Sequence, residues 1–225
     1  MGSAIGQILP TAIGVAISPI PIIAVVLLLA SPKGSGKALG FLLGWLVGLG
    51  IVGVVVLLVA DPAGASTDAG PADWVGWLLV VLGALAILLG IRQFRGRPRG
   101  DEEPPMPKWM AAIDKFTTGR STLIGFVLAA LNPKNLTLTL AAAATIAAAG
   151  LSTTDSYIVL AVFVLIGTLG LAIPIGIYFL GGDKAEQTLE ELHHWLAVHN
   201  AAIMSVLFVV IGAKLLGSGL EIVLA

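Results

Sequence analysis

Long runs of apolar residues alternate with short polar connections along the whole chain. A helix needs about 20 mostly apolar residues to cross a bilayer, and no run shows the alternating pattern of a membrane strand. The pattern predicts an all-α membrane protein with six transmembrane helices. The predicted spans are Ile5–Ala30, Leu39–Ala60, Trp74–Ile91, Thr122–Ala148, Ser156–Leu180 and Ala201–Val223.

The first and fourth predicted spans are each interrupted by proline and polar residues. Ser18–Pro21 reads Ser-Pro-Ile-Pro, and Asn132–Asn135 reads Asn-Pro-Lys-Asn. Proline removes a main-chain hydrogen bond from a helix, and broken helices inside a membrane are tolerated where they line a cavity or are buried in protein. Two interrupted helices in corresponding positions of two halves are typical of a transporter's binding site.

Lysine and arginine residues outside the spans all fall on one side of this topology. The connections after spans one, three and five carry them, whereas those after spans two and four carry aspartate and no lysine or arginine. Cytoplasmic loops are rich in lysine and arginine. We therefore predict a multi-pass inner-membrane protein with the N-terminus and the C-terminus on the extracytoplasmic side.

Three spans in each half give the two halves opposite orientations. We predict two inverted three-helix repeats, residues 1–93 and 120–225. Residues 94–119 form the boundary, a basic, proline-rich cytoplasmic linker that ends in a short amphipathic interfacial helix. A second amphipathic stretch, Ala185–His199, predicts another interfacial helix before the last span.

Glycines recur at fixed intervals in two of the predicted spans. Such small-residue faces let helix backbones approach each other closely, so they predict tight packing, within one chain or between two chains of a homodimer. The glycines in question are Gly36, Gly40, Gly44 and Gly48, spaced by four, and Gly76, Gly83 and Gly90, spaced by seven.

The composition narrows the class of protein further. Hydrophobic residues make up 57% of the chain and charged residues 11%, whereas soluble domains carry about 25% charged residues. The chain has no cysteine, and its predicted spans contain no histidine or core carboxylate. A nucleophile–base pair or a metal cluster is therefore missing. We expect no enzyme activity, no catalytic residue, no metal, no cofactor and no nucleic-acid partner.

Two lysines lie inside predicted spans, Lys134 in the fourth and Lys214 near the middle of the sixth. A charge at that depth costs about 3 kcal/mol or more and usually marks a functional site. Because no acidic residue lies in the span cores, we favour an anionic guest with a carboxylate, phosphate or sulfate group. Two other roles stay open: proton coupling, and a structural lysine bonded to carbonyl groups.

A polar stripe on the first span leads to its break. Gln7, Thr11, Gly14 and Ser18 share one helix face. Hydrogen bonds between helices would also explain the stripe, but its convergence on the two prolines favours a cavity. The candidate substrate-binding and transport residues are Gln7, Thr11, Ser18, Pro19, Pro21, Asn132, Pro133, Lys134, Asn135 and Lys214.

The six-span layout, the two breaks and the arginine-rich central loop resemble the actinobacterial glycolipid-addressing family. That family includes the sulfolipid- and peptidoglycolipid-addressing proteins and lies within the lysine-exporter superfamily. The resemblance covers nearly the whole chain and implies a role in moving cell-envelope lipids or glycolipids across the inner membrane. The family's site residues carry over at Pro19, Pro21, Asn132, Pro133, Lys134 and Asn135.

The function that we expect is that of a secondary transporter or flippase. Its cargo would be an anionic or polar-headed envelope lipid or glycolipid, moved by alternating access at the two broken helices. One alternative is an exporter of a small molecule such as an amino acid or organic anion. Another is a non-transporting scaffold for a larger lipid-export machine. The expected partners are membrane lipids, with a homodimer or that larger complex also possible.

Overall fold

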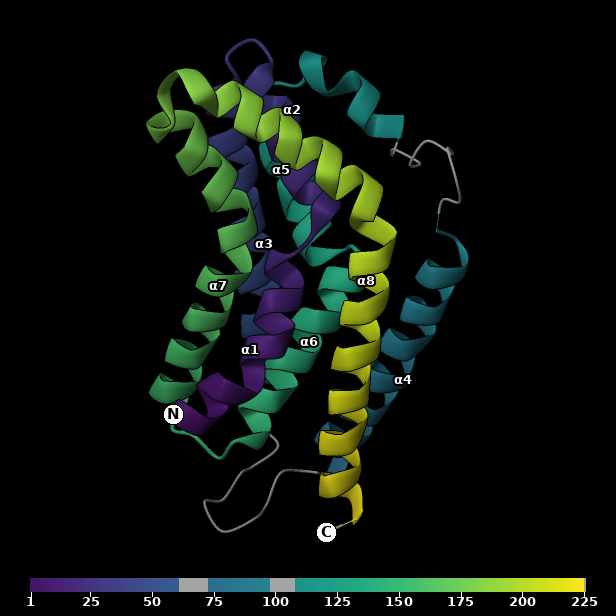
Figure 1. Ribbon diagram of the computed structural model, residues 1–225. Helices are drawn as coiled ribbons and strands as arrows, with labels where there is room; N and C mark the ends of the chain where they lie inside the picture. Colours follow the sequence, from purple (N-terminus) through teal and green to yellow (C-terminus); the bar gives the residue numbers. More distant parts are fainter. Residues whose placement is uncertain (61–72, 98–107, 225) are drawn as a thin grey trace.

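The computed structural model describes residues 1–60, 73–97 and 108–224, and these ranges are helical without a strand (Figure 1). The elements are α1 (Gly2–Ala16), α2 (Pro19–Ala30), α3 (Gly34–Ala60), α4 (Asp73–Arg95), η2 (Lys108–Lys115), α5 (Thr118–Ala130), α6 (Pro133–Ala148), α7 (Thr153–Leu180), η3 (Gly182–Lys184) and α8 (Ala185–Leu224). Four helices are long and apolar enough to cross a membrane, and there are six crossings if each bent helix pair counts as one. The prediction of an all-α, multi-pass membrane protein is confirmed.

Both predicted breaks are present, and the two have the same construction. The chain bends by 50° between α1 and α2 and by 59° between α5 and α6. Ser18 precedes Pro19 at the start of α2, and Asn132 precedes Pro133 at the start of α6. Proline suits the first position of a helix, where its missing N–H would have no partner inside the helix. Each break therefore ends one helix and begins the next within a few residues.

The glycines of α4 pack directly against small residues of α8. A methyl group at Gly83 would lie 2.8 Å from the main-chain oxygen of Gly212, and one at Gly212 would lie 2.8 Å from that of Gly83. The facing pairs are Gly76 with Gly219, Gly83 with Gly212, and Gly90 with Ser205. Numbers rise along one helix as they fall along the other, so α4 and α8 run antiparallel. The predicted glycine packing holds here between the first and the second half of one chain.

The glycines of α3 make a similar contact with α5, but in parallel. Methyl groups at Gly40, Gly44 and Gly48 would collide with successive turns of α5, from Thr118 to Ala129. The numbers rise together, so the two helices run in the same direction. This is the relation that the second and fourth spans of an alternating six-span chain must have.

The two ends of the molecule differ. Both termini lie at one end, while η2 and the first part of α8 lie across the other (Figure 1). The predicted interfacial helix Ala185–His199 is not separate from the last span, because α8 continues through both as one helix of 40 residues. No proline or glycine separates them, so the helical hydrogen bonds are not interrupted.

The predicted interfacial helix in the linker is the 3₁₀ helix η2. Its side chains Met110 and Ile113 are buried, and the rings of Trp109 and Phe116 stack with their centres 6.4 Å apart. The acidic connection at 61–72 and the proline-rich part of the linker at 98–107 lie outside the described residues.

Candidate functional site

The two breaks meet at Lys134, in the first turn of α6. Its Nζ atom lies 3.2 Å from the main-chain oxygen of Ile17 and 2.6 Å from Oγ of Ser18. In a continuous helix Ile17 would accept the N–H of residue 21, but that residue is Pro21, which has none. The lysine of the second half therefore satisfies a carbonyl group that the first half leaves without a partner.

Ser18 satisfies a second free carbonyl group, two residues earlier in the chain. Pro19 cannot donate to the carbonyl group of Val15, and Oγ of Ser18 lies 2.5 Å from that oxygen. Ser18 is buried, with 2% of its surface exposed. Its hydroxyl group gives its proton toward Val15 and accepts from Lys134, so the break is held by side chains of both halves.

Two asparagines hold the other break. The Nδ2 group of Asn135 donates to the main-chain oxygen of Leu128, 2.9 Å away, near the end of α5. Its Oδ1 atom lies 3.3 Å from Oγ of Ser18. The Oδ1 atom of Asn132 caps α6 by accepting the main-chain N–H of Lys134 at 3.0 Å. Ser18, Lys134 and Asn135 thus join the two breaks in one hydrogen-bond network.

A cavity of about 160 Å³ lies at this network. Its polar lining comes from α4, α6, α8 and the residues that precede α2 and α6: Ser18, Gln93, Asn132, Lys134, Asn135 and Asn200. Lys134 is the one charged residue among the described lining residues. Two helices, α2 and α6, begin at the cavity, and helix N-termini carry partial positive charge. Lysine, amide N–H groups and two helix N-termini make this cavity suited to an anion.

The predicted site residues fall into two groups. Ser18, Pro19, Pro21, Asn132, Lys134 and Asn135 all line the cavity. Pro133 begins α6 beside it, exposed.

The second group lies along α1, apart from the cavity. Nζ of Lys214 donates to the main-chain oxygen of Gln7, and the hydroxyl group of Thr11 donates to Ile8 within its own helix at 2.7 Å. Lys134 and Lys214 thus both donate to carbonyl groups of α1 or of the residue that follows it.

Sequence reasoning missed two polar residues of the cavity, Gln93 and Asn200. They lie near the end of α4 and inside α8, more than 100 residues apart in the sequence. Only the packing of α4 on α8 brings them to the same cavity, and no local pattern marks them.

Lys37 has a role that its position in a predicted loop did not indicate. It is 6% exposed, and its Nζ atom lies 3.0 Å from Oγ of Ser31 and 3.0 Å from the main-chain oxygen of Asp114. Through these bonds Lys37 ties η2 to the turn between α2 and α3. The linker is therefore attached to the first half of the chain.

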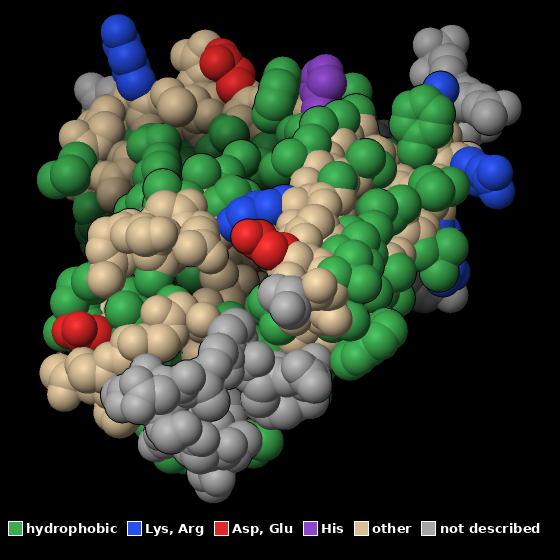
Figure 2. Space-filling model, turned by 90° about the horizontal axis from the view of Figure 1, so that it is seen from below, with side chains coloured by type: hydrophobic (Ala, Val, Ile, Leu, Met, Phe, Trp, Pro, Cys, Tyr) green, Lys and Arg blue, Asp and Glu red, His purple; other side chains and the backbone are tan. Residues whose placement is uncertain are grey.

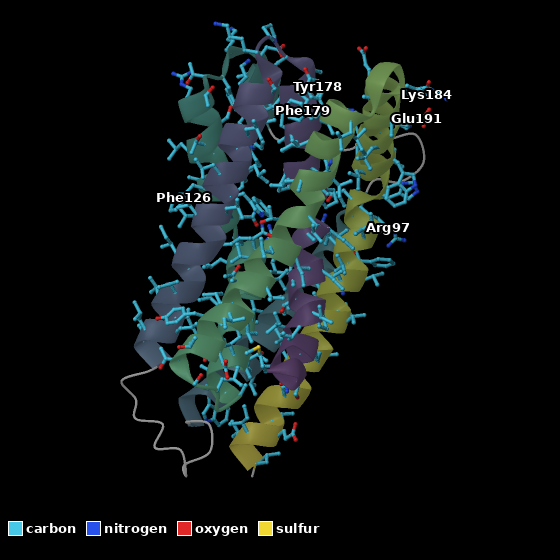
Figure 3. The ribbon with its side chains drawn as sticks, turned by 90° about the vertical axis from the view of Figure 1, so that its left-hand side faces the viewer. Arg97, Phe126, Tyr178, Phe179, Lys184 and Glu191 are labelled. Carbon is cyan, nitrogen blue, oxygen red and sulfur yellow. The ribbon has the colours of Figure 1, made fainter. Side chains whose placement is uncertain are left out.

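A larger cavity, of about 680 Å³, lies at the end opposite the termini. The first part of α8 covers it with Glu186, Glu190 and His193, while α2 supplies apolar side chains, and Tyr178 of α7 completes the wall. Figure 3 shows Tyr178 at the same end of the molecule as the start of α8. The polar residues of this larger cavity include two glutamates, unlike those of the small cavity at Lys134.

One family of known proteins matches the chain over residues 8–221, and its description is Sap, sulfolipid-1-addressing protein. The matched range contains both breaks and every residue that lines the cavity at Lys134. No curated protein and no solved structure matches the chain. With nearly its whole length covered, the chain belongs to the sulfolipid-1-addressing protein family.

Proposed function

We propose that this protein moves a membrane lipid with an anionic head group across the bilayer, and that the head group enters the cavity at Lys134. The observation that supports this proposal is the lining of that cavity. It contains one lysine and several amide side chains, with no acidic residue among the described lining residues. The family description names a sulfolipid, and a sulfate or sulfonate group is an anion of this class. In this proposal the protein is a transporter and not an enzyme.

The size of the cavity limits what it would enclose. Pockets that enclose a whole drug-sized ligand measure about 300–1,000 Å³, whereas this one has about 160 Å³. It has room for one small charged group. The acyl chains of a lipid would stay among the apolar side chains and in the bilayer, as in a flippase.

The hydrogen bonds of Lys134 suggest how binding would be coupled to movement. In the resting structure its ammonium group bonds to Ile17 and Ser18 of the first half. An anion that enters the cavity competes for the same ammonium group, because it adds an attraction between opposite full charges that a carbonyl or hydroxyl group lacks. Binding would therefore loosen the contact between the two breaks. A ligand shifts the equilibrium between two conformations when it binds one of the two more tightly. Alternating access requires such a shift.

The small volume of the cavity also suits a free organic anion, so export of a small molecule is the second candidate. The two functions differ in what the protein retains after purification. A lipid transporter would keep lipids with a particular head group, whereas a small-molecule exporter or a non-transporting scaffold would show no such selection.

Native mass spectrometry of the purified protein tests this proposal. Wild type is compared with Lys134→Ala and with Lys184→Ala, which removes an exposed lysine outside the cavity. We expect an anionic lipid on the wild type and on Lys184→Ala, and its loss from Lys134→Ala. Equal lipid retention in all three proteins, or no selective retention in any, would contradict the proposal.

A further inference from the structure

The polar stripe of α1 has a lysine of the second half at each end. Lys134 bonds to Ser18 at one end, and Lys214 bonds to Gln7 at the other. Eleven residues separate Ser18 from Gln7, which corresponds to about 16 Å along a helix. The stripe therefore joins the cavity to a second polar position, nearer the end that holds both termini.

At the second position, α1 has a carbonyl group that lacks its usual hydrogen bond within the helix. Pro10 lies inside α1 and cannot donate to the carbonyl group of Gly6, the neighbour of Gln7. Lys214 is half-buried beside these turns. Seen from the end with the termini, basic and acidic side chains are both visible near the middle of this face (Figure 2). Polar groups thus lie inside the helical bundle at this end too.

Between the two positions the stripe is closed by apolar side chains. A methyl group at Gly14 would lie 2.6 Å from Cδ1 of Ile211 in α8 and 3.1 Å from Cδ1 of Leu138 in α6. Ile211 and Leu138 are each 1% exposed. Thr11, the polar residue next to them on the stripe, is also 1% exposed. This section has no room for a polar guest.

We infer that Gly14, Leu138 and Ile211 form an apolar constriction in a path along α1. We also infer that Lys214 and Gln7 form a second binding position for the anionic head group beyond it, called the outer station. The inference rests on the proposed function for the identity of the guest. In the resting structure the constriction is shut and the cavity at Lys134 is separated from the outer station. Glu221 lies seven residues after Lys214, on the same face of α8. Glu221 therefore places an acidic side chain about 10 Å further along that face.

Single cysteines test the closed path, because the natural chain has none. Asn200→Cys reports on the cavity, Thr11→Cys on the constriction and Gln7→Cys on the outer station. Gln7 bonds to Lys214 through its main-chain oxygen, so changing its side chain leaves that bond. The reagent is a membrane-impermeant maleimide, added to either side of vesicles that contain the protein in one orientation.

We expect Asn200→Cys and Gln7→Cys to react from opposite sides, and Thr11→Cys from neither. Adding Ile211→Ala removes the apolar side chain and makes Thr11→Cys reactive. Labelling of Thr11→Cys without that change, or labelling of the other two from the same side, would overturn the inference. This readout needs no lipid cargo, so it fails or succeeds independently of the proposed function.

A second comparison uses two glycines of α1. Gly14→Ala forces a methyl group against Ile211, whereas a methyl group at Gly2 meets nothing within 4 Å. We expect Gly14→Ala to slow movement of a fluorescent phosphatidylglycerol across vesicles by about tenfold or more, with Gly2→Ala unchanged. The lipid bound to purified Gly14→Ala should persist, and adding Ile211→Ala should restore movement. Equal movement by the two single variants would contradict the constriction.

Discussion

The ammonium group of Lys134 bonds to the main-chain oxygen of Ile17, across the boundary between the two halves of the chain. Neither residue has this role by itself. The carbonyl group is free because residue 21 is a proline, and the lysine reaches it because Pro133 starts a new helix at the second break. The two proline motifs therefore work as one unit.

Replacing Lys134 with methionine should destabilise the protein as well as slow transport. The variant leaves the carbonyl group of Ile17 without its partner, and an unpaired carbonyl group costs free energy where water does not reach it. Thermal unfolding in detergent should show a lower midpoint than for wild type, while Lys184→Met, on the exposed surface, should not. An unchanged midpoint would show that the bond seen in the structure contributes nothing.

Ser18→Ala should also lower stability, through a different carbonyl group. The hydroxyl group of Ser18 lies 2.5 Å from the oxygen of Val15, and an unsatisfied buried acceptor costs about 1–3 kcal/mol. Ser35→Ala is the control, since Ser35 is only partly buried. Denaturant unfolding of both variants measures the difference, and equal losses would contradict the role of Ser18.

Two glycines of α8 should respond in opposite directions to alanine. A methyl group at Gly212 would lie 2.8 Å from the main-chain oxygen of Gly83, whereas one at Gly217 meets nothing within 4 Å. Overpacking costs about 1–3 kcal/mol, while alanine gains up to about 1 kcal/mol over glycine in a helix. We expect Gly212→Ala to lower the unfolding temperature and Gly217→Ala to leave or raise it. The reverse order would argue against close packing of α4 on α8.

The breaks were predictable from the sequence because proline acts locally. Any helix that contains Ser-Pro-Ile-Pro or Asn-Pro-Lys-Asn loses main-chain hydrogen bonds at that point, whatever surrounds it. Residues 132–135 also lie together in the chain, so most of the second break's polar groups could be assigned to the site at once. The bends of 50° and 59° confirm both interruptions.

The partners of the lysines could not be predicted. Lys134 and Ile17 are 117 residues apart, and which carbonyl group a lysine meets depends on how the two halves pack. The continuity of α8 was missed for a different reason. The amphipathic pattern of its first part resembles that of a separate surface helix, yet the sequence carries no residue that would end the helix before the span.

Lys37→Met should release the linker helix η2 from the first half. Lys37 donates to Ser31 and to the main-chain oxygen of Asp114, so its loss removes both bonds at once. Hydrogen–deuterium exchange of residues 109–116 should become faster, because segments with fewer tertiary contacts open more often. Lys33→Met, which changes an exposed lysine nearby, is the control and should leave exchange at wild-type rates. Identical exchange in both variants would contradict the attachment.

Movement of lipid by the purified protein in vesicles tests the role of the Lys134 cavity most directly. The assay compares a fluorescent anionic lipid, phosphatidylglycerol, with its zwitterionic counterpart, phosphatidylcholine. We predict that wild type and Lys184→Met move the anionic lipid faster than the zwitterionic one, and that Lys134→Met slows the anionic lipid by about tenfold or more. Absence of lipid movement by wild type, or equal rates for wild type and Lys134→Met, would contradict transport through this cavity.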